Sequence, residues 1–363
     1  MTHSSFDESK PVADRTPPEH TVVHTVEGDF LFPRFEVPFP LKHNPHVGAA
    51  AETMWRWVDA SGIISTAEER IRIARTRVDY SGSYAALSAS QPTLELLLKL
   101  LAVSFRVDDL MDEADRGSER CRIRERFISR LFSVLDGKPP SADWPLGRAL
   151  AECWQEIEAR GQGDWLEFMR NDYCSFLETY AHEARMDAEH RLPTLEEFFA
   201  RRIHSVGTMW LWDINDLDLP FLPPHVRTNP HYRNLRQSSS LHIALVNDVY
   251  SLQREMVLGY PYNTVRLLVS KDGCTVQQAV DHVVQLCEDL VSKVMEEWTM
   301  LMADIDDDDL TEFGKRAIET SVESVMLSMR GQLEWHRMVQ RYEIGDLRSR
   351  TCRNWAESAS DLG

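Results

Sequence analysis

The stretch QPTLELLLKLLAVSFRVDDLMDEA, residues 91–114, decides the fold. Its apolar residues recur at spacings of three and four, which is the period of one face of an α-helix. The richest apolar run, 94–103, is interrupted by Lys99 and is much shorter than the roughly 18 to 20 residues of a membrane span. The stretch ends with four carboxylates in six residues. We therefore expect a buried helix that carries an acidic cluster at its C-terminal end.

The same helical period extends over most of the chain, and no alternating β-branched run is bounded by hairpin signals. The first 45 residues differ, because they contain seven of the 17 prolines. The pattern predicts one all-α domain without an internal linker, preceded by an extended or disordered segment. The expected helical stretches besides 91–114 are 144–160, 164–184, 195–213, 235–258, 275–303 and 309–341.

Composition narrows the classes of function. The 363 residues are 43% hydrophobic, so the chain can bury a core, and its formal charge of −18 disfavours nucleic acid and anionic membranes as partners. The N-terminus shows no secretory signal, and six scattered cysteines give neither a disulfide framework nor a zinc pattern. We expect a cytoplasmic protein without stable membrane insertion. A phosphorylated substrate would need metal ions or arginines as intermediaries.

The acidic cluster DDLMDE at 108–113 is the first candidate metal site. Asp108 and Asp112 are four residues apart, so they point to one face of a helix. A hard cation such as Mg²⁺ would neutralise these mutually repelling carboxylates. The alternative is a solvated acidic helix end.

The sequence NDVYSLQRE at 247–255 is the second candidate. Asn247, Ser251 and Glu255 follow one another at intervals of four and therefore form one stripe of oxygen donors. Mg²⁺ accepts this mixture of amide, hydroxyl and carboxylate ligands. The alternative is an ordinary polar helix face.

The two motifs together, DDxxDE followed about 140 residues later by NDxxSxxxE, resemble those of bacterial class I terpene synthases. PFPLKHNPH at 38–46 is similar to the family's N-terminal signature, and Arg341-Tyr342 to its C-terminal pair. The resemblance implies a single-domain helical bundle around a central active-site cavity. It places the synthase domain at 35–345, after an extended or disordered segment 1–34 and before a flexible tail 346–363.

For metal binding, the resemblance implies three Mg²⁺ ions held between the two motifs and the diphosphate of a linear prenyl substrate. Asp108, with Asp112, would bind two ions, and Asn247, Ser251 and Glu255 the third. The implied reaction is that of a carbon–oxygen lyase: the diphosphate leaves, and the remaining allylic cation cyclises to a polycyclic terpene.

Three further residues are expected to contact the diphosphate. Arg254 and Arg341 are candidate guanidinium donors, and Tyr342 adds a hydroxyl group. A surface ion pair is the alternative for Arg254.

The family also has an arginine that senses the diphosphate, 46 positions before the asparagine of the second motif. Counting back from Asn247 gives Arg201, or Arg202 if the register shifts by one. The linker and helix-break positions of the family then fall on His204 and Ser205.

The cavity must contain a reactive cation without exposing it to water, which aromatic faces can do. Phe105 and Trp335 are the expected cavity residues. Trp210 and Trp212 are weaker candidates, because a lone aromatic residue on a helix more often belongs to the plain core. Ala102 is expected at the cavity floor. Its small side chain favours the C20 substrate geranylgeranyl diphosphate over the alternative, C15 farnesyl diphosphate.

Two other functions are less compatible with these residues. A chain-elongating prenyltransferase would have a second aspartate-rich motif in place of NDVYSLQRE. A noncatalytic helical interaction protein would not need the metal positions or the Arg-Tyr pair. The sequence is also compatible with a homodimer.

Overall fold

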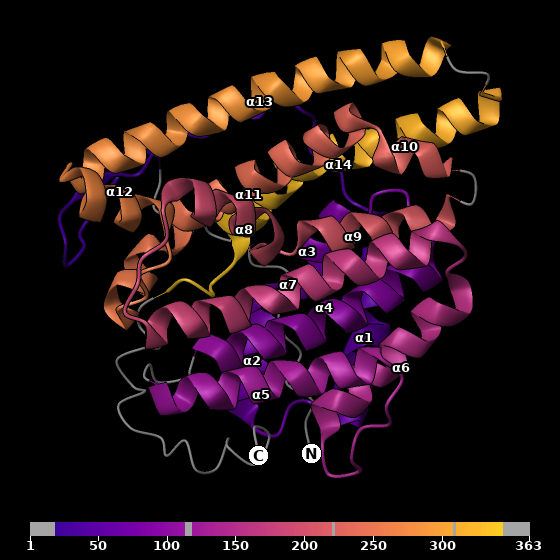
Figure 1. The fold of residues 1–363 in the computed structure, drawn as a ribbon, viewed down its shortest axis with the longest axis horizontal. Coiled ribbons are helices and arrows are strands. Elements are labelled where there is room, and N and C mark those ends of the chain that lie inside the picture. The colour runs from indigo at the N-terminus through magenta and orange to yellow at the C-terminus, as the bar shows by residue number, and fades with distance from the viewer. Residues whose placement is uncertain (1–18, 113–117, 220–221, 308–309, 344–363) are drawn as a thin grey trace.

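The computed structural model describes residues 19–112, 118–219, 222–307 and 310–343. Long helices run side by side, with α13 along one edge of the bundle and α5 and α6 near the opposite edge (Figure 1). The predicted all-α fold is confirmed.

The helices of the first half surround the acidic motif, and those of the second half carry the NDVYSLQRE motif. The first group comprises α1 (Val47–Ser61), α2 (Ala67–Thr76), α3 (Val78–Ala85), α4 (Gln91–Asp112), α5 (Ser118–Leu135), α6 (Pro145–Arg160) and α7 (Asp164–Ala188). The second comprises α8 (Leu195–Ser205), α9 (Thr208–Asn215), the 3-10 helix η1 (Asp216–Asp218), α10 (Pro224–Thr228), α11 (Pro230–Leu258), α12 (Thr264–Asp272), α13 (Val276–Asp307) and α14 (Glu312–Met338).

Helix α4 lies at the centre of the larger hydrophobic core. Its leucines at 94, 96, 97, 98 and 100 are fully buried, because α1, α3, α6 and α9 all pack against it. A helix that is apolar on nearly every side belongs inside a protein. This burial fixes the position of the acidic residues at its C-terminal end.

The expected helix 195–213 is divided in two. Thr194 and Glu197 form a capping box that starts α8, which ends at Ser205. Gly207 then adopts φ of 81°, a left-handed conformation that favours glycine, and α9 starts at Thr208. The break separates α8, which packs on α7 and α11, from α9, which packs on α7 and α4.

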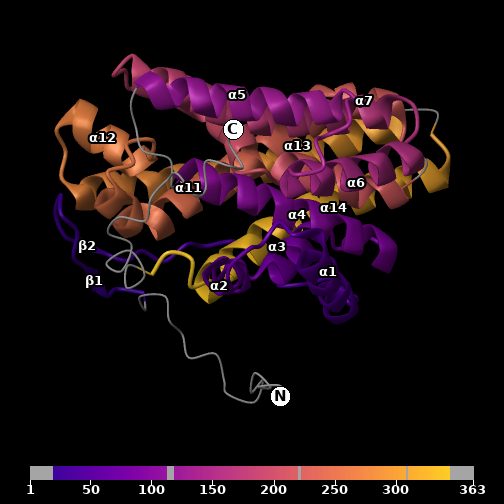
Figure 2. The same ribbon diagram turned by 90° about the horizontal axis from the view of Figure 1, so that it is seen from below.

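The segment 19–34, expected to be extended or disordered, contains a short antiparallel hairpin of β1 (Val22–Val23) and β2 (Phe30–Leu31). Val23, Phe30 and two further phenylalanines are buried in the cluster formed by α11 and α13. Figure 2 shows the hairpin beside α11 and α12. The hairpin was not predicted from the number of prolines, because prolines disfavour helix but are tolerated in edge strands. Residues 1–18 and the predicted tail 346–363 lie outside the described residues.

Among the described helices, none is long and apolar enough to cross a membrane.

Helix packing can be tested at two glycines. A Cβ added at Gly331 of α14 would lie 2.6 Å from the Cβ of Tyr84 on α3, so Gly331→Ala should destabilise the protein by about 1–3 kcal/mol. At Gly48 of α1 an added Cβ meets no described atom within 4 Å, so Gly48→Ala should be neutral or stabilising by up to about 1 kcal/mol. Urea unfolding of both variants measures the difference; equal stabilities would contradict the close contact between α3 and α14.

Candidate active site

The two sequence motifs meet at one cavity between α4, α7, α8, α11 and the segment after α14. Most of the residues singled out from the sequence line it. They are Phe105, Asp108, Ser205, Asn247, Arg254, Glu255, Trp335, Arg341 and Tyr342, joined by Arg202.

Asp108 lies at the polar end of this cavity, where Tyr180 and Arg341 bind its carboxylate. The Tyr180 hydroxyl donates a hydrogen bond of 2.9 Å to one of its carboxylate oxygens, and Arg341 forms an ion pair with the other. Arg341 also donates to buried Asp109, at 2.9 Å. Arg341, which follows α14, is thereby held beside the acidic motif. Asp112 is the last residue of α4, and its side chain lies outside the description.

The side chain of Asn247 is surrounded by specific partners. Its carbonyl oxygen accepts a hydrogen bond of 2.6 Å from Arg202, and its amide donates to the Tyr342 hydroxyl at 2.7 Å. The amide also contacts Nε2 of His336 at 3.2 Å. Asn247 therefore links α8, α11 and the C-terminal segment.

Glu255 supplies a further carboxylate to the cavity, whereas Ser251, one turn before it on α11, is buried and is not among the residues that line the cavity. Burial, with a contribution from nearby Asp248, raises the pKa of Glu255 to about 7. The Ser251 hydroxyl donates to the backbone carbonyl of Asn247 at 2.8 Å and keeps its lone pairs. A buried carboxylate with a raised pKa is stabilised by a cation, so this donor set fits Mg²⁺.

Within the described part of the chain, no three His, Cys, Asp or Glu side chains gather as a metal site. Besides the carboxylate of Glu255, a Mg²⁺ site on α11 would use the amide and hydroxyl oxygens of Asn247 and Ser251.

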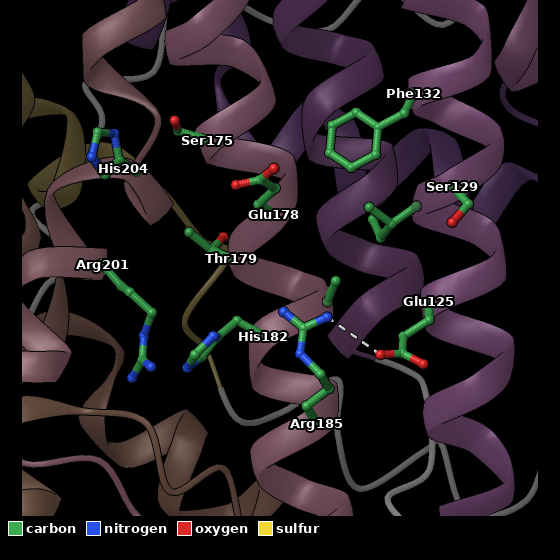
Figure 3. A pocket seen from close by; sticks show the side chains of 12 residues that line it. Glu125, Ser129, Phe132, Ser175, Glu178, Thr179, His182, Arg185, Arg201 and His204 are labelled. Atoms are coloured by element: carbon green, nitrogen blue, oxygen red, sulfur yellow. Dashed lines mark hydrogen bonds and ion pairs between the residues drawn. The ribbon is translucent and has the colours of Figure 1, made fainter.

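The structure distinguishes between the two candidate sensor arginines. Arg202 faces the cavity, and its guanidinium donates to buried Asp248 at 2.7 and 3.0 Å as well as to Asn247. Arg201 instead lines a separate cleft together with His182 and Arg185 (Figure 3). Of the two candidates, Arg202 is therefore the one placed to contact a ligand in this cavity. The same offsets, taken from Arg202, give Ser205 and Val206, where α8 ends.

Aromatic side chains form much of the apolar wall. Phe105 and Trp335 lie 6.1 Å apart between ring centroids, and the Trp335 indole is fixed by a hydrogen bond of 2.8 Å to the Thr76 carbonyl. Trp210 and Phe176 also line the cavity. Trp212 does not; its indole donates to Ser328 within the core.

Ala102 is not at the cavity floor. It is fully buried in the core around α4, and Leu101 lines the cavity instead. At about 100° per residue, six residues before Asp108 is about 120° away from its face, whereas seven residues is only about 20° away. The preference for a C20 substrate therefore loses its support.

Sequence reasoning missed several polar residues of the cavity, among them Tyr180, Glu183 and His336. Burial lowers the pKa of His336 to about 3, and its Nδ1 lies 2.7 Å from the Gln332 carbonyl. His336 is therefore neutral at pH 7, with Nδ1–H as donor and Nε2 as acceptor for Asn247. No local motif marks these residues, since each is defined by its tertiary partners.

The fold and the convergent motifs are those of a class I terpene synthase, and comparisons agree. A family model described as terpene synthase family 2, C-terminal metal binding, matches residues 99–293. The chain belongs to this family of enzymes, the bacterial class I terpene synthases, which are lyases acting on prenyl diphosphates.

Particular relatives extend the match to most of the chain. (2Z,6E)-hedycaryol synthase of Kitasatospora setae is 39% identical over 92% of this chain and 99% of its own. A solved structure of hedycaryol synthase with nerolidol has a TM-score of 0.76 at 36% identity, covering 84% of this chain and all of the other. Pristinol synthase of Streptomyces pristinaespiralis is 26% identical over 85% of this chain and 84% of its own.

A first test of the site compares the adjacent arginines. Arg202→Gln should lower turnover about 100-fold or more, because it removes a charged donor inside the cavity. Arg201→Gln should remain within about threefold of the parent, since that side chain faces the other cleft. Steady-state release of diphosphate measures both. The assignment fails if Arg201→Gln is the more damaging change.

A second test concerns the metal motifs. Asp108→Ala and Asn247→Ala should each reduce turnover about 100-fold or more while helical circular dichroism is retained, because a ligand is lost and not core packing. EDTA should abolish activity, and added Mg²⁺ should restore it. Asp281→Ala, an exposed change on α13, is the matched control. Normal turnover of either cavity variant would contradict the metal assignment.

Proposed function

We propose that this protein is a Mg²⁺-dependent sesquiterpene synthase. It ionises the C15 substrate farnesyl diphosphate and cyclises the resulting cation to a cyclic hydrocarbon or alcohol, with release of diphosphate. The observation that carries this proposal is the convergence of both metal motifs and three arginines on one aromatic-lined cavity. This proposal replaces the C20 substrate expected from Ala102.

The polar end of the cavity is suited to bind the diphosphate. Asp108 with Asp112, and the group Asn247, Ser251 and Glu255, would hold the three Mg²⁺ ions of the proposed site. These ions would offset the charge that develops on the departing oxygen.

Positively charged side chains complete this end. Arg202, Arg254 and Arg341 would donate charge-assisted hydrogen bonds to the diphosphate oxygens, with Tyr342 as a neutral donor. The Asp248 carboxylate fixes the direction of the Arg202 guanidinium before substrate arrives. Such preorganised donors cost no reorganisation during the reaction.

The apolar part of the cavity is suited to hold a carbocation. Phe105, Phe176, Trp210 and Trp335 present rings that attract positive charge without offering a strong nucleophile. His336 is the imidazole in this wall, and its neutral ring has both nitrogens engaged. It is therefore poorly placed to take a proton from the cation.

The choice of a C15 substrate is supported by relatives and by side-chain size. Two relatives are described as cyclising (2E,6E)-farnesyl diphosphate: 7-epi-alpha-eudesmol synthase of Streptomyces viridochromogenes and (+)-T-muurolol synthase of Roseiflexus castenholzii. Within the cavity, Leu101 and the rings of Phe176 and Trp210 occupy volume that a longer chain would need.

The substrate assignment is tested with purified protein, Mg²⁺ and the C10, C15, C20 and C25 prenyl diphosphates. The C15 substrate should give the highest kcat/KM and one dominant cyclic product, identified by mass spectrometry and NMR. A C20 substrate should be turned over at least about tenfold less efficiently, because its additional isoprene unit has to displace packed side chains. A higher kcat/KM for the C20 substrate would refute the C15 assignment, and no turnover of any substrate would refute the enzyme function.

A further inference from the structure

A second cleft lies outside the active site, between α5, α7 and α8, with a volume of about 620 Å³. Its walls carry both charged and apolar residues. Figure 3 shows Arg201, His182 and Arg185 gathered toward one end, with Ser175 and Glu178 farther along α7. Among the metal motif residues that the structure describes, none lines this cleft.

Three nitrogen atoms at this cleft are buried and have no hydrogen-bond partner among the described residues. They are Nη2 of Arg201, Nε2 of His182 and Nδ1 of His204. Buried polar atoms are nearly always paired, because an unpaired donor loses its hydration without compensation. Three such atoms at one cleft indicate a missing hydrogen-bonding partner.

The charges at the cleft favour an anion as that partner. Arg185 is paired with Glu125 at 3.4 Å, and the other acidic lining residue, Glu178, is exposed to solvent. Arg201 has no such close pair, although Glu183 and Glu197 act on it at longer range. Burial and the neighbouring arginines lower the pKa of His182, so a bound anion would relieve an unfavourable environment.

We infer that this cleft binds a small oxyanion of the phosphate class, held by Arg201 and His182. A phosphate oxygen accepts several N–H donors at once, which matches the guanidinium and imidazole edges presented here. The nearby Phe132 and Ile128 add an apolar wall on α5, which would accommodate an organic group on the phosphate. The ligand therefore needs one compact dianionic group and no metal ion.

The cleft is separated from the active site by a single layer of helix. On α8, Arg201 and His204 line the outer cleft, while Arg202 and Ser205 line the inner cavity. On α7, His182 faces outward and Glu183 inward. Thr179 borders both spaces, and its hydroxyl is bonded to the Phe176 carbonyl at 2.6 Å. Variants of adjacent residues can therefore distinguish the two sites.

Inorganic phosphate is the probe for the first experiment. Isothermal titration calorimetry in metal-stripped buffer should show one saturable site, and Arg201→Gln should weaken its Kd at least about tenfold through loss of charge-assisted bonds. Arg191→Gln is the matched control, because it removes the same charge from an exposed residue outside the cleft that pairs with Glu197 at 3.0 Å. Its Kd should stay within about twofold of the parent.

A second variant blocks the cleft by volume instead of charge. Ser175→Trp fills the cleft without changing charge and should also abolish binding, which keeps the test valid if Arg201→Gln does not fold. Circular dichroism establishes folding of each variant. Titration of phenyl phosphate asks whether the apolar wall contributes, and loss of its binding in Ser175→Trp is expected.

Three results would overturn the inference. Equal weakening by Arg191→Gln and Arg201→Gln would mean general charge attraction. Loss of phosphate binding in Arg202→Gln but not in Arg201→Gln would place the ion in the active-site cavity. Absence of saturable binding by the parent protein would mean that the unpaired nitrogens are simply hydrated.

Discussion

The ion pair between Arg202 and Asp248 is the interaction on which the active-site geometry depends. Asp248 is almost fully buried, with one oxygen bound by Arg202 and the other by the backbone and hydroxyl of Thr264. The carboxylate therefore joins α8, α11 and the start of α12 at one point. Removing one partner of a buried pair leaves an uncompensated charge at a cost of about 3–5 kcal/mol. The same guanidinium donates a hydrogen bond to the side-chain oxygen of neighbouring Asn247 and thereby orients that side chain.

The cavity has a polar end, suited to the diphosphate, and an apolar wall, suited to the hydrocarbon part of the substrate. Its polar end has carboxylates and arginines in mutual contact, as with Asp108, Asp109 and Arg341. Its apolar wall holds rings such as Phe105, over which the Arg341 guanidinium lies at 5.3 Å from the centroid. One residue thus touches both environments. The contact of Arg341 with the acidic motif therefore also covers the ring of Phe105.

Much of the site was predictable because it follows helical period and local motif. The burial of α4 and the stripe formed by Asn247 and Glu255 need only a regular helix. Which of Arg201 and Arg202 faces the cavity was not predictable in this way, because it depends on how α8 packs against α7 and α11. The prediction for Ala102 was wrong because it counted residues back from Asp108 without considering the angle of about 100° between successive residues of a helix. Partners such as Tyr180 and His336 are brought to the site only by packing of distant helices.

The N-terminal hairpin covers part of the helical bundle and is fixed to it by polar contacts. Gln277 of α13 bonds the backbone of Leu31, Gln253 of α11 bonds His24, and Arg266 of α12 pairs with Glu27. The hairpin therefore covers the outer side of the helices that carry the second metal motif. Val23, Phe30 and Phe32 are buried in the cluster that includes valines of α11 and α13, so a chain starting at residue 35 would lose part of the apolar cover of that cluster. Exposed apolar surface promotes self-association, so we expect the hairpin to limit association between copies of this protein in addition to packing against α11 and α13.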